Sequence, residues 1–215
     1  MIKAVIFDLD GTLLDTLPDI KKTINDTLRH FSYPEITMEQ TKRYVGDGAY
    51  QLVERAIPKG ACNDEECFEY FKETYAKSDN SETLLFEDEI PTLKALAESG
   101  LKLAIVTNKP QGATLAVTKQ FFSEIPFSFV AGDSGDFPCK PDPALALYAA
   151  MKMQVPPAEC VFVGDGETDA QTAIRAGMRG ISCLWGYRTE EQLRAAGATR
   201  FVRSFGELKK ALENL

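Results

Sequence analysis

The chain has 215 residues, of which 44% are hydrophobic and 26% charged, and its formal net charge is −8. This composition is that of a soluble globular protein with enough apolar residues for a core. The acidic surface argues against nucleic acid and anionic membranes as partners. No apolar run approaches the roughly 20 residues needed to cross a bilayer, and Asp8 and Asp10 interrupt the apolar N-terminus before a secretory signal can form.

Five cysteines are present, an odd number with no Cys-x-x-Cys pair. They indicate free thiols in a reducing compartment, so we expect the protein to be cytoplasmic. The length allows one α/β domain with a small inserted domain.

Five short apolar runs predict the strands of a sheet, and helical patterns lie between most of them. The runs cover residues 4–7, 103–106, 127–130, 160–163 and 180–184. Strands that alternate with helices predict a doubly wound, mostly parallel, Rossmann-like sheet with helices on both faces. The tail from 205 to 215 has the spacing of a terminal amphipathic helix.

Residues 15–83 break this alternation. They contain three helical stripes and no evident strand, which predicts an all-helical insertion after the first strand. We therefore expect an α/β core formed by residues 1–14 and 84–215, and a helical domain formed by residues 15–83. His30, the only histidine, lies beside an apolar helical face and is interpreted as structural.

Polar residues follow three of the predicted strands. Asp8 and Asp10 follow the first strand, Thr107 and Asn108 the second, and Asp165 the run at 160–163. Ligands of such sheets bind outside the carboxyl ends of the strands. Two carboxylates as close as Asp8 and Asp10 need a cation beside them. Oxygen donors favour Mg²⁺, and Asp165 is expected to join them around it.

Lys140 supplies a positive charge in a loop stiffened by Pro141 and Pro143. Together with Thr107 and Asn108 it offers the cation, hydroxyl and amide that a phosphoryl group requires. Each of these features alone has an ordinary explanation as a turn or a solvated charge, and their combination favours a phosphate site.

Four segments then resemble the haloacid dehalogenase superfamily. They are Asp-Leu-Asp-Gly-Thr-Leu at 8–13, Val-Thr-Asn at 106–108, Lys-Pro at 140–141, and 164–169, which begins with Gly-Asp. Their order and spacing match across the whole chain, and the insertion lies where that superfamily places a helical cap. The resemblance implies a Mg²⁺-dependent phosphatase acting on a small phosphorylated metabolite.

The resemblance also implies roles for individual residues. Asp8 would attack phosphorus to form an aspartyl-phosphate, and Asp10 would serve as general acid and then general base. Asp8, the backbone carbonyl of Asp10, and Asp165 would bind Mg²⁺. Dehalogenases and phosphonate-cleaving relatives lack a carboxylate at the position of Asp10, so its presence implies phosphomonoester chemistry.

The remaining implied roles concern phosphate binding and support. Thr107, Asn108 and Lys140 would hold the transferring phosphoryl group. Asp169 would orient Lys140 or the water shell of the metal, and Gly11 and Thr12 would form the tight turn behind the nucleophile.

The loop around Gly46 and Gly48, followed by Arg55, resembles the cap loop of bacterial phosphoglycolate phosphatases. It implies these three residues as substrate contacts and 2-phosphoglycolate as the first candidate substrate. Two departures from that pattern are Asp47, an acid where the substrate carboxylate is expected, and Gly166, where relatives have Ser or Thr.

Other readings stay open at this point. They are a sugar-phosphate or nucleotide phosphatase, a pyrophosphatase, a mutase of the β-phosphoglucomutase kind, and a catalytically inactive phosphate-binding module. The sequence is compatible with a monomer or a homodimer.

Overall fold

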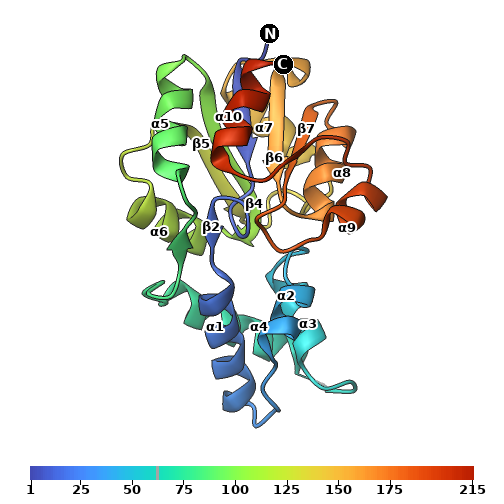
Figure 1. Cartoon of the computed structure of the whole chain (residues 1–215). Coiled ribbons are helices and arrows are strands. Elements are labelled where there is room, and N and C mark those ends of the chain that lie inside the picture. Colours follow the sequence, from blue (N-terminus) through green and yellow to red (C-terminus); the bar gives the residue numbers. More distant parts are fainter. Residues whose placement is uncertain (62) are drawn as a thin grey trace.

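A six-stranded sheet forms the centre of the molecule (Figure 1). The structure is a computed structural model, and it describes residues 1–61 and 63–215, so Cys62 lies outside the described residues. The strand order is β5-β4-β1-β6-β7-β8, and all neighbouring pairs are parallel. The strands are β1 (Ala4–Phe7), β4 (Lys102–Pro110), β5 (Phe127–Asp133), β6 (Cys160–Gly164), β7 (Arg179–Cys183) and β8 (Phe201–Val202). The predicted doubly wound α/β fold is confirmed.

Both faces of the sheet are buried, because successive side chains of a strand point to opposite sides. In β1, Val5 and Phe7 belong to one apolar cluster, whereas Ala4 and Ile6 belong to the other, and all four are fully buried. A strand covered on both faces is therefore a continuous apolar run rather than an alternating one. This property made β1, β4 and β6 visible in the sequence.

Helices cover the two faces of the sheet, as Figure 1 shows. The first apolar cluster includes residues of α5, α6 and α10, and the second includes residues of α7 and α8. The helices of this part of the chain are α5 (Glu89–Glu98), α6 (Gln111–Phe121), α7 (Ala144–Lys152), α8 (Glu167–Arg175), α9 (Glu190–Ala195), α10 (Phe205–Glu213) and the 3-10 turn Pro157–Glu159.

A helical insertion with its own apolar core lies at one end of the sheet (Figure 1). Its helices are α1 (Leu17–His30), α2 (Met38–Tyr44), α3 (Ala49–Ala56) and α4 (Asp64–Ala76). Three of them match the expected stripes. The additional helix, α2, buries only Thr41, and it begins with a capping box between Thr37 and Gln40. We call these four helices the helical insertion.

A two-stranded antiparallel ribbon connects the helical insertion to the sheet. It pairs β2 (Leu14–Asp15) with β3 (Leu84–Leu85). The expectation of no strand within 15–83 is therefore wrong at Asp15, which pairs with Leu84. Asp19 of α1 reinforces this junction, because its Oδ2 accepts hydrogen bonds from the Thr83 hydroxyl at 2.6 Å and from the backbone N–H of Glu82 at 3.1 Å.

Within the described ranges, no helix combines the length and the apolar character that a membrane crossing requires.

Candidate active site

Three carboxylates meet at the carboxyl ends of the two central strands. Asp8 follows β1, Asp165 follows β6, and Asp169 lies in the first turn of α8. One oxygen from each lies within 4.8 Å of the others. Because β1 and β6 are parallel neighbours in register, the segments that follow them leave the sheet side by side. The expected convergence of strand ends thus brings Asp8 and Asp165 together.

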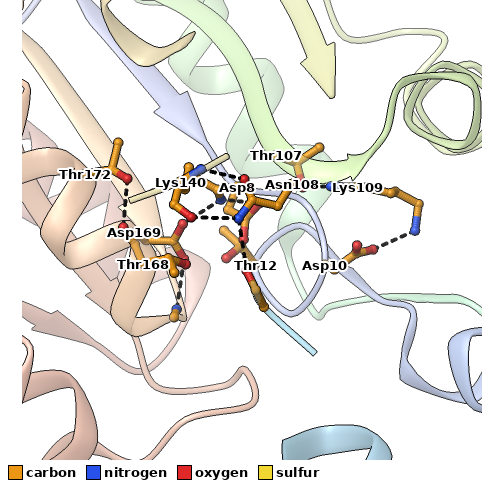
Figure 2. A network of polar contacts seen from close by, with 12 residues as sticks. Asp8, Asp10, Thr12, Thr107, Asn108, Lys109, Lys140, Thr168, Asp169 and Thr172 are labelled. Atoms are coloured by element: carbon orange, nitrogen blue, oxygen red, sulfur yellow. Dashed lines mark hydrogen bonds and ion pairs between the residues drawn. The ribbon is translucent and has the colours of Figure 1, made fainter. Parts of the chain in front are cut away.

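Lys140 is buried among these acids. Its Nζ lies 2.8 Å from Asp8 Oδ1 and 2.6 Å from Asp169 Oδ1. Burial alone would lower the pKa of Lys140, but the carboxylates of Asp169 and Asp8 outweigh that effect and raise it, so the ammonium group stays charged. Asp169, predicted to support Lys140, does contact it (Figure 2).

Three carboxyl groups surround this single cation, and the pKa values of two of them are raised. Burial, followed by repulsion from Asp169, raises the pKa of Asp8 to about 6 and that of Asp165 to about 7. A buried group of carboxylate oxygens with more negative than positive charge fits a hard divalent cation such as Mg²⁺. This acid cluster is therefore a suitable environment for that ion.

Asp165 is held firmly although Gly166 supplies no hydroxyl. It accepts hydrogen bonds from the Thr12 hydroxyl at 2.9 Å and from the backbone N–H of Tyr187 at 2.7 Å. Gly11 has a φ of +82°, and a Cβ there would lie 2.4 Å from Asp165 Oδ2. Only glycine allows this turn and this close approach together. The backbone N–H of Gly166 instead donates to Asp169 at 2.8 Å.

The side chain of Asp10 points away from the acid cluster. Its Oδ1 accepts a hydrogen bond from the Thr16 hydroxyl at 2.6 Å and pairs with Lys109 Nζ at 2.8 Å. Figure 2 shows this pair apart from the group formed by Asp8, Lys140 and Asp169. Asp8 and Asp10 are thus two carboxylates with different surroundings.

Lys109 was missed in the sequence, although it directly follows Thr107 and Asn108. Its side chain is only 1% exposed. Its Nζ also contacts the hydroxyl group of Tyr75 in α4 and lies 4.3 Å from the centroid of that ring. A lysine is ordinarily a surface residue, so the signal that could have found it was its position at a strand end. It connects the sheet to the helical insertion.

Thr107 and Asn108 lie at the same edge, and their side chains have different surroundings. The hydroxyl of Thr107 accepts a hydrogen bond from the backbone N–H of Lys109 at 3.3 Å. The amide group of Asn108 brackets Lys140, accepting from its N–H at 2.7 Å and donating to its carbonyl at 3.0 Å. It also donates to the carbonyl of Gly46 at 3.1 Å. The Asn108 side chain therefore joins the end of β4 to the loop at Lys140 and to the loop at Gly46.

A cavity lies between the sheet end and the helical insertion. The sheet side supplies polar groups, including Asp8, Asp10, Thr107 and Lys109. The helical insertion supplies Ile20, Val45, Gly46, Gly48, Ala49, Leu52, Phe71 and Tyr75. Gly46 and Gly48, which the resemblance implies as substrate contacts, are thus among the residues that line the cavity.

Arg55 is not among the described residues that line this cavity. It forms an ion pair with Asp47, with Nη2 2.5 Å from Oδ2, and donates to the carbonyl of Tyr44 at 3.0 Å. Asp47 of the loop and Arg55 of α3 therefore neutralise each other outside the cavity. Asp47 does not leave an unpaired negative charge facing a substrate.

Two further residues of the sheet side join the site to the helical insertion. Arg188 pairs with Glu167 at 2.8 Å and donates to the carbonyl groups of Lys42 and Val45. The hydroxyl of Tyr187 accepts from the backbone N–H of Thr16 at 3.0 Å. The sequence did not single out Arg188.

Trp185 serves packing and support. Its ring lies 4.8 Å from that of Phe205, centroid to centroid, and its Nε1–H donates to the carbonyl of Thr12 at 3.0 Å. The cysteines at 67, 139, 160 and 183 are free thiols.

A family model described as haloacid dehalogenase-like hydrolase matches residues 5–183. The chain belongs to this family.

Relatives and solved structures agree with this assignment. The phosphoglycolate phosphatase of Vibrio vulnificus strain YJ016 is 34% identical over 217 residues, which cover 96% of this chain and 94% of that protein. The phosphoglycolate phosphatase of Vibrio parahaemolyticus is 31% identical with the same coverage. The structure of a predicted phosphoglycolate phosphatase from Haemophilus somnus has a TM-score of 0.85 and 29% identity, covering 98% of this chain and 97% of that one. The expected resemblance and the expectation of a phosphatase are confirmed.

Proposed function

We propose that this haloacid dehalogenase-like phosphatase is a Mg²⁺-dependent phosphomonoester hydrolase that works through an aspartyl-phosphate on Asp8 and acts on 2-phosphoglycolate. One observation carries the proposal. Asp8 lies at the end of β1 on the cavity wall, beside a buried cation, Lys140, and the acids Asp165 and Asp169. A nucleophile, a charge-balancing lysine and a cation-binding group are the parts that phosphoryl transfer needs.

The proposed reaction has two steps. An oxygen of Asp8 forms a bond to phosphorus while the bond to the leaving oxygen breaks, and Asp10 donates a proton to that oxygen. Water then attacks the aspartyl-phosphate, Asp10 takes its proton, and Asp8 and inorganic phosphate are released. Lys140 and Thr107 would stabilise the charge on the phosphoryl oxygens. The orientation of Asp10 toward Lys109 means that its side chain must rotate before it assists the leaving group.

Mg²⁺ would be held by Asp8, Asp165 and the backbone carbonyl of Asp10. When bound, it neutralises charge on the phosphoryl oxygens and on the acid cluster. Asp169 would act by orienting Lys140, which it contacts at 2.6 Å. Gly11 and Thr12 would hold Asp165 in place.

Residues 15–83 are proposed as a cap domain over a core of residues 1–14 and 84–215. The cap would exclude water during phosphoryl transfer and admit it for hydrolysis. We place the protein in the cytoplasm as a monomer or homodimer, with a small phosphorylated metabolite as its ligand.

The choice of 2-phosphoglycolate rests on the names of the relatives and is consistent with the cap loop. Gly46 and Gly48 line the cavity. Asp47 was expected to repel the carboxylate of this substrate, but its charge is neutralised by Arg55. Arg55 itself retains its proposed substrate role only if it leaves that ion pair. Sugar phosphates, nucleotides and pyrophosphate are the competing substrates.

Phosphate release from a panel of these compounds tests the proposal. With Mg²⁺, 2-phosphoglycolate should have the highest kcat/KM, and EDTA should abolish turnover until Mg²⁺ is restored. Asp8→Asn should be inactive on every compound, because an amide is a poor nucleophile. A higher kcat/KM for another compound would overturn the substrate, and turnover by Asp8→Asn free of deamidated protein would overturn the covalent mechanism.

A further inference from the structure

Lys109 is a buried cation on the cavity wall whose negative partner is Asp10. The hydroxyl group of Tyr75 contacts the same ammonium group. Burial raises the pKa of Tyr75 well above its ordinary value, so this hydroxyl stays neutral. Asp10 is therefore the group in this arrangement that balances the charge of Lys109. A buried lysine without a counter-charge is strongly disfavoured, so Asp10 cannot leave unless another anion replaces it.

The cavity offers few other cations to a substrate. The described residues of the helical insertion that line it contribute no charged side chain. Arg188 lines it from the sheet side, but Glu167 and the carbonyl groups of Lys42 and Val45 already occupy its guanidinium. Lys140 is held at Asp8, where the phosphoryl group is transferred. Among the described lining residues, Lys109 is thus the cation best placed for the leaving part of a substrate.

The same pair controls the availability of Asp10. In the proposed reaction Asp10 must reach the leaving oxygen, yet its Oδ1 is held by Lys109 at 2.8 Å and by Thr16 at 2.6 Å. A substrate with a carboxylate close to its ester oxygen can supply the anion that Lys109 requires. In 2-phosphoglycolate a single carbon separates the two groups. A substrate with an uncharged leaving group supplies none.

We propose that Lys109 is a specificity-determining residue that binds the carboxylate of the leaving group in place of Asp10. A leaving group with a negative charge thereby frees the Asp10 side chain, which can then donate its proton to the leaving oxygen. The number of charges around Lys109 is the same before and after the exchange. The inference rests on the proposed function, because that function assigns the role of Asp10. Selection for a carboxylate would then come from the sheet side of the cavity rather than from Arg55.

The test compares a substrate that carries this negative charge, 2-phosphoglycolate, with one that lacks it, 2-hydroxyethyl phosphate, in which CH₂OH replaces the carboxylate. The variants are Lys109→Met and, at an exposed lysine of α6, the control Lys119→Met. In Lys109→Met the ratio of the two kcat/KM values should fall by about 10²-fold, as expected for loss of one partner of a buried charge pair. Most of the loss should lie in KM for 2-phosphoglycolate. Lys119→Met should keep the wild-type ratio.

Several outcomes separate the explanations. An equal loss on both substrates would leave the ratio unchanged and would mean that Lys109 acts only through the position of Asp10, which would overturn the inference. The absence of any loss on either substrate would overturn it as well. Lys109→Gln provides a second variant if Lys109→Met does not fold by circular dichroism.

A second matched pair makes the test independent of the natural substrate: 2-phospholactate and propane-1,2-diol 2-phosphate. If the wild-type enzyme prefers a metabolite other than 2-phosphoglycolate but still discriminates within both pairs through Lys109, the inference stands and only the proposed substrate fails. If the wild-type enzyme does not discriminate within either pair, the inference fails even where 2-phosphoglycolate is hydrolysed.

Discussion

Asp8 and Asp10 lie two residues apart, yet the fold gives them different partners. Asp8 faces Lys140 and the acid cluster, whereas Asp10 faces Lys109 and Thr16. Different surroundings are what two carboxylates need if one is to attack and the other is to transfer protons. The two proposed roles of Asp10, general acid and then general base, belong to different half-reactions and can therefore be tested separately.

Asp10→Asn should slow an alkyl phosphate by about 10²- to 10⁴-fold, because general acid catalysis of its departure is lost. An aryl phosphate needs little protonation of its leaving group, so it should still phosphorylate Asp8. The aspartyl-phosphate should then hydrolyse slowly. Stopped-flow measurement of phenol release should show a burst followed by a slow steady state, with phosphate trapped on the protein. Equal slowing of both substrates without a burst would show that Asp10 acts mainly through metal binding or structure.

The residues of the site differ in how far the sequence could place them. Asp8 and Asp165 end neighbouring parallel strands, so a general rule of the fold brings them together. Lys109 also lies at the carboxyl end of a strand, but nothing in the sequence shows that its side chain is buried or that it pairs with Asp10. Arg55 was placed by resemblance alone, and its ion pair with Asp47 directs it away from the cavity.

At the scale of elements, continuous apolar runs predicted the main strands of the sheet, whereas the shortest strands were not predicted. The strands β2, β3 and β8 have two residues each, too few to show any periodicity. Small side chains also give a weak apolar pattern in α7 and α8. Alanines supply a large part of the buried faces of these helices, whereas the larger Met151 and Ile174 are 60% and 59% exposed.

The start of α5 contains a buried carboxyl group outside the site. Glu89 is 1% exposed, and its Oε2 accepts a hydrogen bond from the backbone N–H of Phe86 at 3.2 Å. Burial raises the pKa of Glu89 from 4.5 to about 9, although the Phe86 hydrogen bond opposes this shift. Between these two values the folded protein holds a proton that the unfolded chain has lost. The free energy of unfolding should therefore fall as pH rises through this window.

Glu89→Gln should remove this dependence. The variant should be more stable than the wild type by an amount that grows with pH and reaches about 3 kcal/mol at pH 7, from about 1.4 kcal/mol per pH unit. Urea unfolding at pH 5, 6, 7 and 8 measures the difference. Glu87→Gln, at an exposed neighbouring position, is the control and should show no such trend. A difference for Glu89→Gln that is constant across pH would contradict the raised pKa.

At the scale of the whole molecule, polar contacts around the cavity join the helical insertion to the sheet. Arg188 donates to the carbonyl groups of Lys42 and Val45, and Asn108 donates to that of Gly46. Each such hydrogen bond contributes about 0.5–1.5 kcal/mol. Contacts of this strength can be broken and remade during turnover, whereas the apolar core of each part remains intact.

Arg188→Ala should therefore favour an open arrangement without unfolding either part. We expect kcat/KM to fall by about tenfold, from the loss of two such hydrogen bonds, and the radius of gyration from small-angle scattering to increase. The melting temperature should change little. Arg194→Ala, which removes an exposed ion pair with Glu190 in α9, is the matched control. An unchanged radius of gyration together with a large loss of stability would mean that Arg188 supports the fold rather than closure.

The ribbon of β2 and β3 affects how this chain can change during evolution. Leu14 pairs with Leu85, so the polypeptide leaves the sheet and returns to it at adjacent points, roughly 5 Å apart as in any antiparallel pair. A segment whose two ends are neighbours can be lengthened, shortened or exchanged without moving the strands that hold Asp8 and Asp165. The helical insertion is in this sense a separable module, because the polypeptide enters and leaves it through one pair of adjacent strands. Sequence changes within the insertion can alter the helical wall of the cavity while the acids at the sheet edge keep their positions.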